Sequence, residues 1–321
     1  MTEKSASKDI SRQRVPPPAH PRERRQPLPE CEPKPPHEDA TAPERLRAIL
    51  QSPSYRTADQ DVTFLKGAET RGPRLQLDYL KAETLLERHG IRHTIVVFGG
   101  TRIAEPLAAQ RQLDALREDL AARPNDDDLK RRVATTERVL EKSKYYEVAR
   151  DFSRLVGSAT ALHDRRLAVV TGGGPGIMEA SNRGAYDVGA LSIGFNITLP
   201  QEQFPNPYVT PELCFQFHYF ALRKLHFLLR ARALVAFPGG FGTFDELFET
   251  LTLVQTRKIE PLPIILVGES YWRRAFDPAF LEAEGTIDPE DRDLFWYAET
   301  ADEIWSDIQT WYDRAGRPFL P

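Results

Sequence analysis

Short apolar runs alternate with longer stretches of helical periodicity along most of the chain. Five runs rich in Val, Ile, Leu and Phe are short enough to form buried strands. They span residues 91–98, 167–170, 191–197, 233–237 and 263–267. Because helical patterns separate them, the pattern predicts a doubly wound α/β domain: a Rossmann-like, mostly parallel sheet with helices on both faces.

The helical patterns fall before, between and after these runs. We expect helices at residues 43–51, 74–89, 145–162, 214–232, 271–280 and 299–315. Residues 106–144 are charged and break at Pro124-Asn125, so we interpret them as a helical hairpin inserted into the domain, with a solvated face.

Composition divides the chain into three parts. Ten of the 26 prolines precede residue 45, which predicts a disordered Pro-rich tail at residues 1–43. Residues 44–90 form an N-terminal helical lead-in. Residues 91–321 hold enough apolar side chains for the core of one Rossmann-like domain.

Charge and cysteine content exclude several classes of function. The net charge of −4 disfavours nucleic acid as a partner. No apolar run approaches the roughly 18–20 residues that span a bilayer, and no signal peptide is visible, so we expect no membrane partner and a cytoplasmic protein. Cys31 and Cys214 stand far apart, and His218 and His226 lack a partnering acid, so we expect neither a metal site nor a cofactor.

The run at 233–237 ends in a glycine-rich turn, Pro238-Gly239-Gly240-Phe241-Gly242-Thr243, that opens a helical pattern. Glycines let backbone N–H groups approach an anion, and the start of a helix favours negative charge. The turn therefore predicts a phosphate cradle, with Glu246 in the first helical turn beside it. Thr243 and Glu246 also fit a capping box, which is the alternative interpretation.

Two other strands end in glycines. Gly99-Gly100 follows the first run, and Gly172-Gly173-Gly174-Pro175-Gly176 follows the second. The second turn is not the dinucleotide fingerprint, because Ile177 occupies its third glycine position and no acidic residue ends the next strand; NAD is therefore disfavoured. Glu179 either faces the crevice or only stabilises the helix dipole. The Gly99-Gly100 turn either lines a ligand crevice or is only a tight turn between a strand and a helix.

A basic pair precedes the last glycine turn. Arg223 can reach a phosphate or a leaving group through its fork of donors, or it can be an ordinary surface arginine. Lys224 follows it directly. A pyridoxal phosphate enzyme is disfavoured because neither Lys224 nor Lys258 has a setting typical of a Schiff-base lysine.

Together, the second glycine turn with Ile177-Met178-Glu179-Ala180, the pair Arg223-Lys224 and the stretch from Pro238 to Glu246 resemble the Lonely Guy (LOG) family over roughly residues 91–270. The resemblance implies hydrolysis of the N-glycosidic bond of a nucleoside 5′-monophosphate, either a cytokinin riboside monophosphate or an ordinary nucleotide. The products are a free base and ribose 5-phosphate. It also implies a homodimer. A carrier of nucleotide or molybdenum cofactor with the same fold is the alternative.

Residue by residue, the resemblance assigns catalysis to Arg223 and Glu246. The expected phosphate- and nucleotide-binding residues are Gly99, Gly100, Gly173, Gly174, Glu179, Lys224, Gly239, Gly240, Gly242 and Thr243. The hairpin and the leading helices are longer than in the compact plant-type enzymes, which bears on base preference more than on the chemistry.

Overall fold

The computed structural model describes residues 32–162, 167–199 and 204–319. Most of the expected Pro-rich tail, residues 1–31, lies outside them. The chain divides into two compact units, one ending at Thr70 and the other beginning at Arg71. In the first unit, helix α1 (Ala42–Gln51), the 3₁₀ helix η1 (Pro53–Tyr55) and helix α2 (Val62–Leu65) contain no buried residue.

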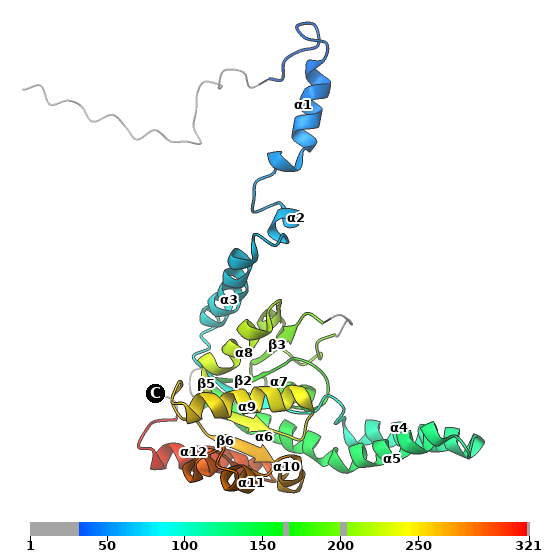
Figure 1. Cartoon of the computed structure of the whole chain (residues 1–321), viewed down its shortest axis with the longest axis vertical. Helices are drawn as coiled ribbons and strands as arrows, with labels where there is room; N and C mark the ends of the chain where they lie inside the picture. Colours follow the sequence, from blue (N-terminus) through cyan, green and yellow to red (C-terminus); the bar gives the residue numbers. More distant parts are fainter. Residues whose placement is uncertain (1–31, 163–166, 200–203, 320–321) are drawn as a thin grey trace, which may run out of the picture. The chain divides into compact units, whose positions relative to one another are not determined.

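The second unit is built on a seven-stranded sheet in which every neighbouring pair is parallel (Figure 1). Its order is β4-β3-β2-β1-β5-β6-β7. The strands are β1 (His93–Phe98), β2 (Leu167–Thr171), β3 (Ser192–Ile197), β4 (Cys214–Phe217), β5 (Ala231–Ala236), β6 (Ile264–Val267) and β7 (Trp296–Ala298). The chain winds outward from β1 on one side and then from β5 on the other, so the direction of winding reverses between β1 and β5, where sheets of this kind bind ligands.

Helices connect these strands and cover the sheet. They are α3 (Arg71–Arg88), α4 (Pro106–Ala122), α5 (Asp127–Lys142), α6 (Lys144–Leu162), α7 (Ile177–Asp187), α8 (Phe220–Leu229), α9 (Phe241–Gln255), α10 (Glu269–Ala275), α11 (Pro278–Ala283) and α12 (Ala301–Arg314), with short 3₁₀ helices η2 (Pro211–Leu213) and η3 (Pro289–Leu294). Among the described residues, no helix is long and apolar enough to cross a membrane.

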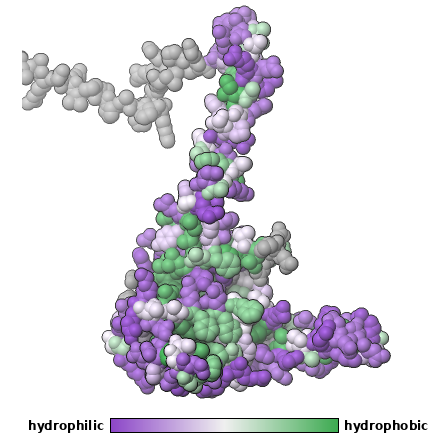
Figure 2. All heavy atoms as spheres, in the orientation of Figure 1, coloured by the Kyte–Doolittle hydropathy of each residue, from purple (hydrophilic) through white to green (hydrophobic). Residues whose placement is uncertain are grey.

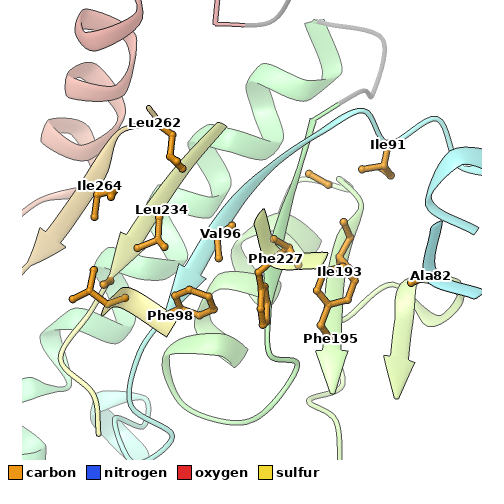
Figure 3. Close-up of a cluster of buried hydrophobic side chains, with 14 of the residues drawn as sticks. Ala82, Ile91, Val96, Phe98, Ile193, Phe195, Phe227, Leu234, Leu262 and Ile264 are labelled. Carbon is orange, nitrogen blue, oxygen red and sulfur yellow. The ribbon is translucent and has the colours of Figure 1, made fainter. Parts of the chain in front are cut away.

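Two hydrophobic clusters lie on opposite faces of the sheet, because alternate residues of a strand point to opposite sides. Val96 and Phe98 of β1 face the first cluster, which includes side chains of α3, α8, α9 and α10 (Figure 3). Ile95 and Val97 face the second, which includes side chains of α6, α7 and α12. Helices on both faces of a parallel sheet confirm the predicted doubly wound α/β fold.

The expectation of one helix over residues 214–232 was wrong. Its first four residues form strand β4, and α8 begins only at Phe220. Phe215 and Phe217 are buried whereas Gln216 is exposed, which is the alternation of a strand at the edge of a sheet. Four residues are too few for this alternation to stand out from the apolar helix that follows.

Two further boundaries differ from expectation. The three-residue strand β7 was missed because so short a run carries little periodicity. Residues 271–280 form parts of two helices, since α10 ends at Ala275 and Asp277 caps α11 just before Pro278.

The predicted hairpin region forms α4 and α5, which pack against each other (Figure 1). Asp126 caps α5 by accepting from the backbone N–H groups of Asp128 and Leu129. A small apolar seam of its own, separate from the two clusters of the sheet, holds the pair together. It consists of Leu113, Leu116, Leu129 and Val133.

The close packing of α6 on α7 is testable at Gly184. A Cβ atom there would lie 2.0 Å from the carbonyl oxygen of Arg150. We expect Gly184→Ala to lower the free energy of unfolding by about 1–3 kcal/mol through overpacking, measured by urea denaturation. In the control Gly72→Ala, in helix α3, the new Cβ meets nothing within 4 Å. That variant should be neutral or slightly more stable; an equal effect of both substitutions would contradict the packing argument.

Candidate active site

The turns that follow β1, β2 and β5 meet at one edge of the sheet. The N–H of Gly100 donates to the carbonyl of Pro238 at 2.9 Å, and the carbonyl of Gly100 accepts from the N–H of Ile177 at 3.3 Å. The backbones are so close that a Cβ at Gly176, whose φ is +74°, would lie 2.4 Å from the Gly100 oxygen. The three glycine turns therefore form one continuous surface of backbone.

Arg223 of α8 and Glu246 of α9 form a buried ion pair at this edge. Nη1 of Arg223 donates to Oε1 of Glu246 at 3.1 Å, and the two side chains are only 11% and 12% exposed. Nε of Arg223 donates to the carbonyl of Phe195 at 2.6 Å. A Cβ at Gly172 would lie 2.6 Å from Nη2. The arginine thus reaches the glycine turn after β2, where a side chain at position 172 would force Arg223 and Met178 to shift.

Burial changes the ionisation of this pair. It raises the pKa of Glu246 from 4.5 to about 7, while the positive charge of Arg223 acts in the opposite direction and the neighbouring Asp245 adds to the rise. Desolvation lowers the pKa of Arg223, partly offset by Glu246. A carboxyl group that titrates near neutrality inside a cleft is typical of functional sites.

The capping-box interpretation of the last glycine turn was wrong. Gly240 is the N-cap of α9, and no side chain caps this helix. Thr243 instead packs against Gly239, where an added Cβ would lie 2.1 Å from the threonine Oγ1, and Glu246 turns toward Arg223. Helix α7, which begins after Gly176, also lacks a side-chain cap. The unpaired N–H groups at the two helix starts are therefore not occupied by capping side chains, as an anion site requires.

The remaining glycines of these turns differ in their surroundings. Gly173 has a φ of +73° and packs against Asn196, so it is required by the backbone itself. At Gly240 and Gly242 an added Cβ would meet nothing within 4 Å. These two positions are open, and a ligand can approach their backbone without obstruction.

A buried polar network, which sequence reasoning missed, holds the glycine turn after β2. Asn206 donates from Nδ2 to the carbonyl of Gly174 and to Oδ1 of Asn182, both at 2.9 Å. Thr171 donates to the same Asn182 oxygen at 2.8 Å and accepts from the N–H of Gly173 at 2.9 Å. The signal in the sequence was an asparagine inside a helix, a position that asparagine disfavours unless its side chain has a specific partner.

Two predicted site residues contact other parts of the domain. The ammonium group of Lys224 pairs with Asp245 at 2.9 Å and with Glu249 at 3.0 Å, so it ties α8 to α9. Glu179 accepts at 2.9 Å from the hydroxyl of Tyr146 on α6, and burial is the main reason that the pKa of this tyrosine is raised. Lys224 thus lines the hollow beside Glu246 without donating to it, whereas the hydrogen bond of Glu179 is to α6.

The space around the pair is tight. The hollow beside Glu246 between α8 and α9, lined by Phe98 and Phe227 among others, does not admit a water molecule. Oε2 of Glu246 accepts no hydrogen bond within residues 32–162, 167–199 and 204–319. The described residues therefore leave the hydrogen-bonding capacity of this oxygen unused. Nowhere in the described chain do three or more His, Cys, Asp or Glu side chains gather as a metal ion would require.

Comparison with known proteins shows which proteins this chain is similar to. A family model described as possible lysine decarboxylase matches residues 178–308. A cytokinin riboside 5′-monophosphate phosphoribohydrolase of the LOG type from Arabidopsis thaliana is 29% identical over 172 residues, which cover 51% of this chain and 74% of the relative. Over about half of its length, the chain is similar to phosphoribohydrolases of the LOG type.

Other proteins to which the chain is similar are equally distant. A probable cytokinin riboside 5′-monophosphate phosphoribohydrolase from Oryza sativa subsp. japonica is 27% identical over 180 residues, covering 52% of this chain and 77% of the relative. Among solved structures, the Moco carrier protein from Chlamydomonas reinhardtii is 16% identical, with a TM-score of 0.40 over 70% of this chain and 99% of its own.

The raised pKa of Glu246 predicts a pH dependence of stability. Between pH 4.5 and about 7 the folded protein keeps a proton that the unfolded carboxyl group has released. The stabilising contribution of this group is therefore complete below pH 4.5 and is lost as the pH rises through 7. We expect the free energy of unfolding of the wild type to fall relative to Glu246→Gln over this interval, measured by urea denaturation at several pH values. Parallel curves for the two proteins would contradict the assignment.

Proposed function

We propose that this protein hydrolyses the N-glycosidic bond of a nucleoside 5′-monophosphate, giving a free base and ribose 5-phosphate. The observation that carries the proposal is the buried Arg223–Glu246 pair at the junction of three glycine turns. The names of the plant relatives support the same reaction class and suggest a cytokinin riboside monophosphate as substrate. An ordinary purine or pyrimidine nucleotide is the alternative substrate.

The 5′-phosphate binds at the start of α9 in this proposal. Helix starts present unpaired N–H groups and a partial positive charge, and α9 has no side-chain cap to compete with a ligand. The open backbone at Gly240 and Gly242 supports direct contact with phosphate oxygens. Gly239 and Thr243 complete the turn and fix its shape.

Cleavage of the bond between C1′ and the base develops positive charge on the sugar, as in glycoside hydrolysis. Glu246, as the carboxylate, stabilises this charge and orients the attacking water with its free oxygen. The water supplies hydroxide to C1′, and its proton leaves with the base. Arg223 holds the carboxylate in place and helps to keep it ionised, because its positive charge opposes the effect of burial on the pKa of Glu246.

The description of the family model as a possible lysine decarboxylase finds little support at Lys224. Its ammonium group is paired with two carboxylates on α9, Asp245 and Glu249. A Schiff base with pyridoxal phosphate requires a neutral amine. Burial acts to lower the pKa of Lys224, but its two carboxylate partners together outweigh burial, so the pKa is raised and the charged form is favoured.

Glu246→Gln tests the proposal directly. Removing the negative charge but keeping the shape should lower kcat by at least about 10²-fold, the usual contribution of one acid–base group. The assay incubates the protein with AMP, GMP, CMP or isopentenyladenosine monophosphate and measures free base by chromatography. The matched control is Glu249→Gln, three residues further along α9, where the glutamate pairs with Lys224. This variant should keep its activity.

Near-wild-type turnover by Glu246→Gln would refute the role of this residue. If the wild type released no base from any of the four nucleotides but retained a ligand through purification, the carrier function would replace the hydrolase.

We also propose that the protein is a homodimer. Apolar side chains stand exposed on neighbouring helices of the second unit, and Figure 2 shows this apolar surface over α8 and α9. They are Phe220, Leu225 and Leu229 on α8 and Phe241 and Phe248 on α9. Phe241 is 96% exposed, which is unfavourable for a large apolar side chain in a monomer. A second copy that covers this face removes that cost.

Leu225→Asp places a charge within this apolar face, so we expect it to convert the dimer to a monomer in light scattering after size-exclusion chromatography. Leu107→Asp, at an exposed leucine of α4 outside the face, is the control and should remain dimeric. A wild-type protein that is monomeric at micromolar concentration would contradict the proposal.

A further inference from the structure

A second cavity lies near the glycine turns, on another side of α9. Its volume is about 700 Å³, within the range of roughly 300–1,000 Å³ typical of small-molecule sites. Four helices contribute to its walls. Glu141 and Lys142 come from α5, Lys144 and Tyr145 from α6, Phe244 from α9, and Ser270, Tyr271, Arg274 and Ala275 from α10.

The charged side chains of the cavity are mostly positive. Lys142, Lys144 and Arg274 line the cavity together with one carboxylate, Glu141, and the ammonium group of Lys142 also donates to the carbonyl of Arg138 at 3.0 Å. The closest carboxylate to Lys144 is that of Glu299, at 3.8 Å. Within the described chain, neither Lys142 nor Arg274 has a carboxylate within 4.0 Å. This excess of positive charge is available to a multiply charged anion.

The same cavity has aromatic walls. Phe244 and Tyr271, both partly exposed, supply ring surfaces, and Ser270 supplies a hydroxyl group; Tyr145 is buried, with the ammonium group of Lys144 over its ring. Aromatic faces bind the planar ring of a base, whereas lysine and arginine bind phosphate oxygens through charged hydrogen bonds. The combination fits a nucleotide better than a simple inorganic anion.

The cavity and the Arg223–Glu246 pair lie against different faces of α9. Phe244 packs against Trp272 of α10, with ring centroids 5.4 Å apart. Glu246 instead faces Arg223 of α8. A ligand in the cavity therefore does not occupy the hollow beside the pair, which has its own lining from α8 and α9.

One cavity residue also holds the last glycine turn. The hydroxyl of Tyr271 donates to the carbonyl of Gly239, while the side chain lines the cavity. An occupant that shifts this ring changes the support of the turn that receives the substrate phosphate in the proposed function. The cavity is thus placed to influence nucleotide binding without touching Glu246.

We propose that this cavity is an allosteric site for a nucleotide that carries two or more phosphates, and that its occupancy changes the affinity for the nucleoside monophosphate. Three cations beside two carboxylates, Glu141 and Glu299, favour the additional phosphates, and the aromatic walls receive the base. The part of the proposal that concerns substrate affinity rests on the proposed hydrolase function; binding to the cavity does not.

The binding test uses the full-length protein and isothermal titration calorimetry with ATP and, separately, inorganic triphosphate, both in the presence of EDTA. We expect ATP to bind more tightly than triphosphate because of the aromatic walls. The double variant Lys142→Ala/Arg274→Ala should weaken ATP binding by about tenfold or more, since two charged contacts are lost. Excess AMP should not abolish the ATP signal.

The matched control is Lys130→Ala/Arg273→Ala, which removes the same two charges from the same helices. Lys130 and Arg273 do not line the cavity and pair with Asp127 and Glu269. This variant should bind ATP as the wild type does. Equal weakening in both double variants, complete displacement of ATP by AMP, or no binding of ATP at millimolar concentration would overturn the site.

The second measurement is the KM for AMP with and without ATP. We expect ATP to change KM in the wild type and the control variant but not in Lys142→Ala/Arg274→Ala. ATP binding without any change in KM would overturn the allosteric part of the proposal. If no base is released from any monophosphate while ATP still binds in the predicted way, the hydrolase proposal fails and the binding site stands.

Discussion

The approach of one guanidinium group to a bare stretch of backbone is the constraint on which the site depends. Arg223 touches β3 through the carbonyl of Phe195, α9 through Glu246, and the turn after β2 at Gly172. Any side chain at Gly172 would occupy the place of Nη2. Buried ion pairs add little to the free energy of unfolding because desolvation opposes their attraction. The arrangement is therefore better explained by its effect on the position and pKa of Glu246 than by a gain in stability.

The sheet supplies the rest of this geometry. Strands β1, β2 and β5 are neighbours at the centre of the sheet, so the turns at their carboxyl ends lie side by side even though they are far apart in the sequence. Direct hydrogen bonds between the turns at Gly100, Pro238 and Ile177 then fix their relative positions. The buried hydrogen-bond network of Asn182 and Asn206 supports the second turn through the carbonyl of Gly174. Each glycine turn is thus supported by the others and by a polar core.

Sequence patterns were sufficient for the central architecture and insufficient for its edges. The five apolar runs became β1, β2, β3, β5 and β6 because buried parallel strands require continuous apolar residues. Strand β4 was missed because its four residues precede an apolar helix. The convergence of Arg223 with Glu246 was implied by family resemblance, whereas the partners of Lys224 and Glu179 depend on how α8, α9 and α6 pack, which local patterns do not encode.

The most direct test of the account is a crystal structure of the Glu246→Gln variant with AMP bound, since this substitution keeps the shape of the site while slowing turnover. The account predicts that the phosphate accepts hydrogen bonds from backbone N–H groups between Gly239 and Thr243, with C1′ of the ribose facing residue 246. A phosphate bound away from this turn, or a ribose that faces away from residue 246, would contradict it.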